Sequence, residues 1–134
     1  MAASQYNFTI DQGSSFSLVL TNKDSNNNIV DLTNYCARLT MTTSKGDTYV
    51  FETENTDPSL YKFYIEGNLG KISLLIPASI TNSYNFDTAR YDLEIKSPND
   101  HYVSGGKYVE RIMYGVITLN KRFSKSPTLL DCEA

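Results

Sequence analysis

Apolar and polar side chains alternate with a period of two along much of the chain. The alternation is strictest in four runs, whose apolar members are Phe16, Leu18 and Leu20; Ala37, Leu39 and Met41; Ile72, Leu74 and Ile76; and Tyr91, Leu93 and Ile95. Successive side chains of a β-strand point to opposite faces of its sheet, so each run predicts a strand with one buried face. Shorter strands are predicted at residues 6–10, 48–54 and 62–66.

The last long run, residues 109–119, alternates less regularly than the others. Strict alternation would place Val109, Arg111 and Met113 on one face and Ile112, Tyr114 and Val116 on the other. Gly115 lies inside this run, and a glycine within a strand is typical of a bulge or of a close approach by another backbone.

Turn-forming residues separate the predicted strands at short intervals. Reversals are expected at residues 24–28, 45–47, 67–70, 97–100 and 104–106, where Gly, Asn, Asp, Ser and Pro gather. Residues 77–82 predict a single helical turn, because Pro77 stands where a missing N–H costs nothing. Asp31 is expected to cap a second short turn, with Leu32 and Tyr35 closing one end of the domain.

This pattern predicts an all-β fold with one domain over residues 1–119. About eight short strands joined by tight turns favour a β-sandwich with immunoglobulin-like or jelly-roll wiring. A closed β-barrel is the alternative, since alternation does not distinguish one closed sheet from two packed sheets.

Residues 120–134 lose the alternation and contain Pro127, so they predict an extended C-terminal arm. Three apolar side chains in this arm, Phe123, Leu129 and Leu130, are the candidate partner-binding residues. They could pack on this domain or on a neighbouring subunit, and we favour the neighbour because Pro127 keeps the arm extended.

Composition narrows the range of functions. The 134 residues carry a formal net charge of -3 and no long basic run, which argues against a nucleic-acid partner. No apolar stretch approaches the ~20 residues that cross a bilayer, and the first residues do not resemble a signal peptide. Cys36 and Cys132 have no metal-type spacing, so we expect free thiols, with Cys36 as a small core residue.

Candidate chemistry is sparse, and we expect no catalytic, cofactor-binding or metal-binding residues. His101, the single histidine, is expected in a solvent-facing turn without a nucleophile beside it. Asp92 and Glu94 are expected on the solvated face of their strand, as surface charges rather than a catalytic pair. The loop that begins at Asp24 resembles the start of a calcium loop but has Ile29 at the position that requires Gly.

Three stretches of the chain carry short motifs in a fixed order. They are residues 6–20, with Gln12-Gly13 after a short strand; residues 29–39, with Asp31-Leu32-Thr33 and Ala37-Arg38; and residues 91–95 with 111–119, with Tyr91-Asp92-Leu93-Glu94 and Gly115. This order resembles that of small virion structural proteins of tailed bacteriophages, and is similar to the immunoglobulin-like N-terminal domains of baseplate and fibre-adaptor proteins. Residues 43–70 carry no such resemblance.

The resemblance implies a non-enzymatic component of a phage particle, made in the host cytoplasm and present in many copies in the tail, baseplate or neck. Its partners would be other virion proteins, in a homo- or hetero-oligomeric assembly without nucleic acid or membrane. The alternative function is a carbohydrate-binding or adhesin module, in which exposed members of the ten tyrosines would contact sugar.

Overall fold

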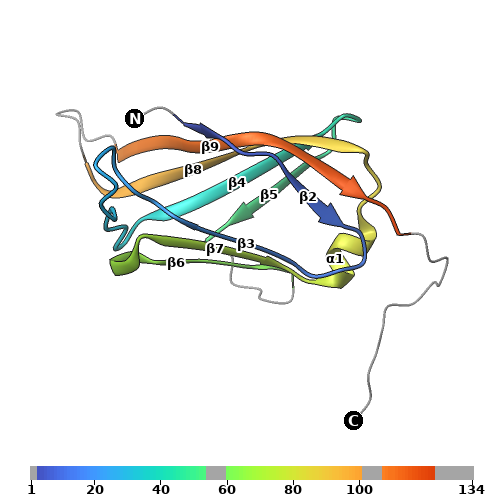
Figure 1. The fold of residues 1–134 in the computed structure, drawn as a ribbon, viewed down its shortest axis with the longest axis horizontal. Helices are drawn as coiled ribbons and strands as arrows, with labels where there is room; N and C mark the ends of the chain where they lie inside the picture. Colours follow the sequence, from blue (N-terminus) through green and yellow to red (C-terminus); the bar gives the residue numbers. More distant parts are fainter. Residues whose placement is uncertain (1–2, 54–59, 101–106, 123–134) are drawn as a thin grey trace, which may run out of the picture.

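Two β-sheets pack face to face in the computed structural model, which describes residues 3–53, 60–100 and 107–122 (Figure 1). Sheet A contains β1 (Ser4–Gln5), β2 (Phe8–Asp11), β9 (Lys107–Asn120), β8 (Thr88–Asp100), β4 (Cys36–Thr43) and β5 (Thr48–Glu52). Sheet B contains β3 (Phe16–Thr21), β7 (Lys71–Ile76) and β6 (Lys62–Glu66). The prediction of an all-β sandwich is therefore confirmed.

The strand order is that of an immunoglobulin-like sandwich. In sheet A, β9, β8, β4 and β5 lie side by side and are antiparallel, while β3, β7 and β6 form the antiparallel sheet B. This order matches strands G, F, C and C′ of an immunoglobulin domain facing strands B, E and D. Of the predicted alternatives, the jelly roll and the closed barrel do not form.

The core lies between the two sheets and confirms the predicted alternation. Its buried side chains on the long strands include those of Ala37, Leu39, Met41, Ile72, Leu74, Ile76, Tyr91, Leu93 and Ile95. Phe16, Leu18 and Leu20 are partly buried against the same cluster. Burial of each large apolar side chain stabilises the fold by about 1.5–3 kcal/mol, so the period-two pattern determines which faces meet.

Several predicted turns form as their residues require. Asp24 Oδ1 accepts the backbone N–H groups of Asn26 and Asn28, so this carboxylate shapes its own loop. Asp31 Oδ1 accepts the N–H of Thr33 at 2.9 Å, and hydrogen bonds from the Thr33 hydroxyl and N–H hold the pKa of Asp31 below its ordinary value. The short helix α1 (Ala78–Ser83) follows Pro77, close to the predicted position.

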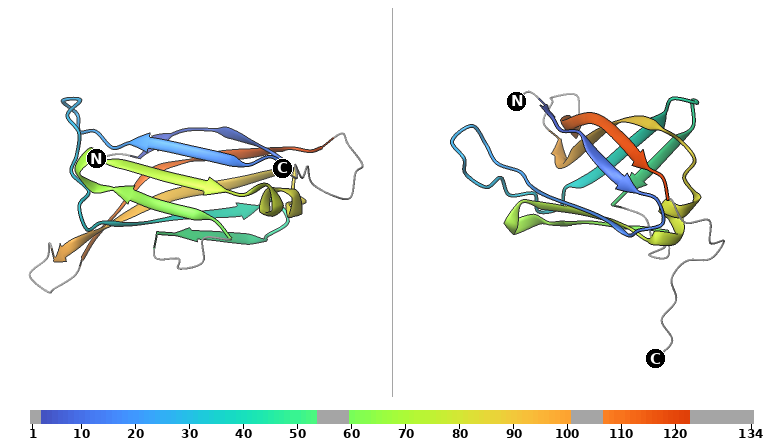
Figure 2. Two further views of the ribbon diagram at one scale, coloured as in Figure 1. Left: turned by 90° about the horizontal axis from the view of Figure 1, so that it is seen from below. Right: turned by 45° about the vertical axis from the view of Figure 1, so that its right-hand side comes forward.

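The predicted reversal at residues 97–100 is wrong, because β8 continues through these residues to Asp100. The register between β8 and β9 shifts between Lys96 and Asp100, so the irregularity lies in the segment that contains Pro98. A bulge tolerates proline because its N–H is not needed in the ladder. The long β8–β9 hairpin consequently extends past sheet B, as Figure 2 shows on its left side. The other predicted reversal, at 104–106, lies outside the described residues.

A second irregularity changes which side chains of β9 face outward. Leu93 pairs with Met113 but the next residue of β8, Glu94, pairs with Arg111, so Ile112 is an extra residue on β9. Such a bulge reverses the facing of the side chains that follow it. Strict alternation therefore gave the wrong face for Arg111, which lies on the same side of sheet A as Tyr114.

The N-terminal strand segments run parallel to β9 and form one edge of sheet A (Figure 1). Between β1 and β2, Tyr6 passes directly over Gly115, and a Cβ atom there would collide with the Tyr6 carbonyl oxygen. The Asn7 side chain fills the gap in the ladder, since its Oδ1 accepts the Val116 N–H at 2.9 Å. The prediction of a close backbone approach at Gly115 is confirmed.

Tyr91, a buried residue of β8, also holds the N-terminal segment in place. Its hydroxyl donates to the Tyr6 carbonyl oxygen at 2.5 Å, and its ring packs against Phe8. Burial, with a smaller effect of nearby Tyr6, raises the pKa of Tyr91 from 10.0 to about 12. The neutral phenol is thus part of the folded structure.

We predict that Gly115→Ala lowers the free energy of unfolding by about 1–3 kcal/mol, because the added methyl group displaces the N-terminal strand. Urea unfolding measures the change. Thr118→Ala, at an exposed position of the same strand, is the control and should change stability by less than about 0.5 kcal/mol. Equal behaviour of the two variants would show that the N-terminal strand does not lie on β9 in solution.

We predict that Tyr91→Phe removes a pH dependence of stability. The folded state raises the pKa of Tyr91 from 10.0 to about 12, so its stabilising contribution is complete below pH 10 and is lost as the pH rises towards 12. The difference in Tm between the native protein and the variant should be constant up to about pH 10 and then shrink. Parallel curves up to pH 12 would contradict the role given to this hydroxyl.

Candidate interaction surfaces

The outer face of sheet A is the broadest regular surface of the described structure. It is formed by the side chains that point away from the core on β5, β4, β8 and β9, which are Thr48, Val50 and Glu52; Cys36, Arg38, Thr40 and Thr42; Arg90, Asp92, Glu94 and Lys96; and Val109, Arg111, Tyr114 and Val116. The opposite face of each strand is used in the core, and no other described strand or helix packs on this face.

Four charged residues form one row across this face. Cross-strand pairing places Glu52 beside Arg38, Arg38 beside Glu94, and Glu94 beside Arg111. Along the row the sign of the charge therefore alternates from β5 to β9. Within the described residues the row contains one ion pair, Arg38 to Glu52 at 3.2 Å, and these side chains are 55% and 45% exposed. Such an exposed pair contributes little to stability.

Apolar surface flanks the charged row on both sides. Val109 is 52% exposed and Val50 is 43% exposed, although each lies on a strand of the sheet. Arg111 lies over the ring of Tyr114, with the guanidinium carbon 5.0 Å from the ring centroid. This mixture of apolar side chains, an arginine and a tyrosine is typical of protein interfaces.

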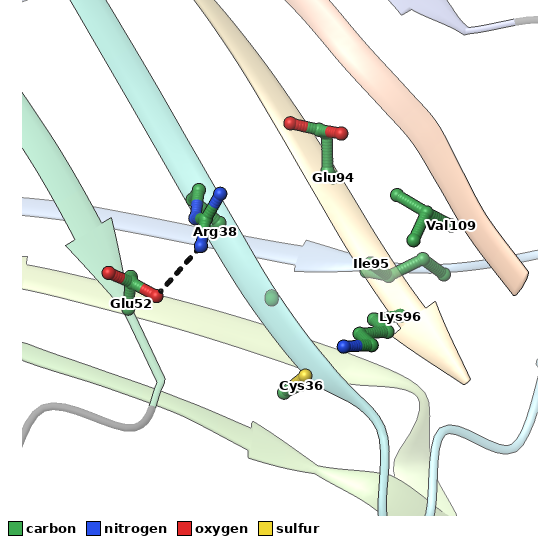
Figure 3. A pocket seen from close by; sticks show the side chains of 8 residues that line it. Cys36, Arg38, Glu52, Glu94, Ile95, Lys96 and Val109 are labelled. Atoms are coloured by element: carbon green, nitrogen blue, oxygen red, sulfur yellow. Dashed lines mark hydrogen bonds and ion pairs between the residues drawn. The ribbon is translucent and has the colours of Figure 1, made fainter. Parts of the chain in front are cut away.

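A hollow of about 340 Å³ lies at one end of this face (Figure 3). Its lining residues are Cys36, Ala37, Arg38, Glu52, Glu94, Ile95, Lys96 and Val109. Cys36 was predicted to be a core residue, and this is wrong, because it is half-buried at the wall of the hollow. Its described lining has four charged side chains and no histidine or hydroxyl nucleophile that could act with the thiol.

Sheet B has a smaller apolar outer face. Val19 and Tyr64 lie on either side of buried Ser73, and Leu75 lies in the neighbouring row. The Lys62 ammonium group lies 5.5 Å from the centroid of the Tyr64 ring. Three tyrosines are exposed in the described residues: Tyr6, Tyr64 and Tyr114. Of these, only Tyr64 lies on this face.

The end of β9 is fixed to the sandwich before the predicted arm continues. Lys121 pairs with Asp87 at 3.0 Å, and this ammonium group holds the pKa of Asp87 below its ordinary value. The Arg122 N–H donates to Gln12 Oε1, and its guanidinium donates to Asn82 Oδ1 at 2.9 Å. The predicted partner-binding residues Phe123, Leu129 and Leu130 lie outside the described residues.

Asp92 and Glu94 are the residues considered for catalysis that the structure describes. Asp92 and Glu94 lie on the outer face of sheet A, as predicted, and His101 lies outside the described residues. No group of three or more His, Cys, Asp or Glu side chains in the described part of the chain could hold a metal ion. Within the same residues, no helix has the length and hydropathy to cross a membrane.

Comparison with known proteins assigns no family to the chain. No protein-family model matches it, and a search of the curated proteins found no match. The surfaces and their chemistry are therefore the basis for a functional proposal.

We predict that the outer face of sheet A is dispensable for folding. Val109→Thr replaces an exposed side chain and should change the free energy of unfolding by less than about 0.5 kcal/mol. Ile117→Thr on the same strand buries a hydroxyl group in the core and should cost about 2–4 kcal/mol. Denaturant unfolding of both variants measures the difference. A large loss for Val109→Thr would mean that this face is covered in the folded monomer.

Proposed function

We propose that the protein is a non-enzymatic structural component of a tailed-bacteriophage particle, located in the tail, baseplate or neck. It acts by packing against other virion proteins and is made in the cytoplasm of the host. The observation that carries this proposal is the resemblance of three stretches of the chain to phage virion proteins.

The immunoglobulin-like wiring supports the proposal, because the resembling stretches fall on elements that meet in the fold. The first stretch contains β2 and β3, the second leads into β4, and the third comprises parts of β8 and β9. β2, β9, β8 and β4 are consecutive neighbours in sheet A. The motifs on β2, β9, β8 and β4 therefore lie on one continuous piece of sheet A, and only β3 lies in sheet B.

The C-terminal arm is the proposed partner-binding element. Arg122 is tied to Gln12 and Asn82, so the last described residue is held at a defined point beside α1. Beyond this point the chain contains Phe123, Leu129 and Leu130, each worth about 1.5–3 kcal/mol when fully buried. An apolar segment that starts at a fixed point suits addition to a neighbouring subunit.

Sugar binding is the competing function, and the three exposed tyrosines of the described residues do not favour it. Tyr114 lies on the outer face of sheet A, Tyr64 on the outer face of sheet B, and Tyr6 at the edge formed by the N-terminal segment. These three rings therefore form no shared stacking platform for a sugar chain.

Mass spectrometry of purified phage particles from a producing host tests the proposal directly, and absence of the protein from every particle would refute it.

We predict that removal of residues 123–134 leaves folding intact and prevents incorporation into the particle. The deletion keeps Lys121 and Arg122, because both contact the sandwich. The Tm should stay within about 2 °C of the full chain, while the truncated protein is missing from purified particles. Unfolding of the truncated domain would place the arm in the core, and normal incorporation would exclude it as the binding element.

A matched pair of full-length variants separates the apolar side chains from the length of the arm. Replacement of Phe123, Leu129 and Leu130 by Ser should reproduce the loss of incorporation. Replacement of Ser124, Ser126 and Thr128 by Ala changes as many positions of the same segment and should have no effect.

A further inference from the structure

We propose that two copies of this chain associate through the outer face of sheet A, about a two-fold axis that runs parallel to the strands. The partner is a second copy of the chain, and the contact is isologous, so each surface meets itself. This inference does not depend on the proposal that the protein belongs to a phage particle.

The first argument is the charged row. When the order of the row is reversed in a second copy, every charge meets an opposite charge. From β5 to β9 the row reads Glu52, Arg38, Glu94 and Arg111, so the charges alternate from negative to positive. A two-fold axis along the strands, between β4 and β8, reverses the order of the row in the second copy. Glu52 then faces Arg111 of the second copy, and Arg38 faces its Glu94. All four charges meet an opposite charge.

The neighbouring rows match under the same rotation, which is the second argument. One row reads Val50, Thr40, Asp92 and Tyr114, so its reversal places Val50 against Tyr114 and Thr40 against Asp92 of the second copy. Apolar side chains thus meet each other at the two edges, and a hydroxyl group meets a carboxylate at the centre. Under the same rotation Thr42 of the following row faces Arg90 of the second copy, again without a like-charge contact.

The other two-fold arrangement is unfavourable. An axis that runs across the strands along the charged row keeps the order of the row, so Arg38 would face Arg38 and Glu94 would face Glu94. Like charges in direct opposition are destabilising. Of these two arrangements the charge pattern favours the axis along the strands, with the strands of the two copies roughly parallel, as in aligned sheet packing.

The size of the face indicates a weak, reversible dimer. Four strands spaced ~4.8 Å apart and about four alternate positions along each strand, ~6.8 Å apart, give a flat area of roughly 500 Å² per copy. Side-chain relief increases this area, and the total lies near the lower end of the range for specific interfaces. We expect a dissociation constant in the micromolar range that rises with ionic strength, because charges lie at the centre of the contact.

Charge reversal at positions 38 and 94 tests the contact and its symmetry. Sedimentation equilibrium of the full chain under reducing conditions should show a monomer–dimer equilibrium. Arg38→Glu and Glu94→Arg should each weaken self-association at least tenfold, because each places like charges opposite one another twice. An equimolar mixture of the two variants should form dimers again, since every central pair is then opposite in sign, and the double variant should also dimerise.

Restoration by mixing keeps the test independent of the stability of either variant, and circular dichroism confirms that each is folded. Lys71→Glu, on the outer face of sheet B, is the matched control and should leave the dissociation constant unchanged. A monomer at all concentrations, or mixed variants that do not associate, would overturn the inference. Neither result would bear on incorporation into a particle, which is measured separately.

Discussion

The contact between the N-terminal segment and β9 at Gly115 is the constraint on which sheet A depends. The segment reaches hydrogen-bonding distance of β9 only because position 115 has no side chain. The segment is then held by two hydrogen bonds, one from the Val116 N–H to the Asn7 side chain and one from the Tyr91 hydroxyl to the Tyr6 carbonyl oxygen. The first and last strands of the domain pair in parallel as a result, so the whole chain between them acts as their crossover connection.

This pairing also determines what the two edges and the chain end can do. The N-terminal segment covers part of the outer edge of β9, which would otherwise offer unpaired backbone groups to other chains. The same pairing brings Gln12 next to the end of β9, where its side chain accepts the Arg122 N–H. The position of Arg122, the last described residue, therefore depends on the contact at Gly115.

The alternation of residue types was sufficient to predict the core strands and the all-β class, because burial of one face is a local requirement that each strand meets separately. It did not decide between two packed sheets and a closed barrel. It was not sufficient for features that depend on a partner strand. The parallel pairing joins residues at opposite ends of the chain, and β8 continues through Ser97-Pro98 because a bulge accommodates the proline. Cys36 was assigned to the core from its residue type, although its position in β4 points it to the outer face.

The surfaces were less predictable than the core for the same reason. The bulge at Ile112 moves Arg111 to the outer face, where it completes the row that begins at Glu52. Without the bulge, β9 would present no positive charge to that row. Glu52 would then have no opposite charge to face in the second copy. The contacts proposed for these charges thus depend on backbone register. In the sequence they look like ordinary surface charges, and they form an ordered row only when four strands are aligned.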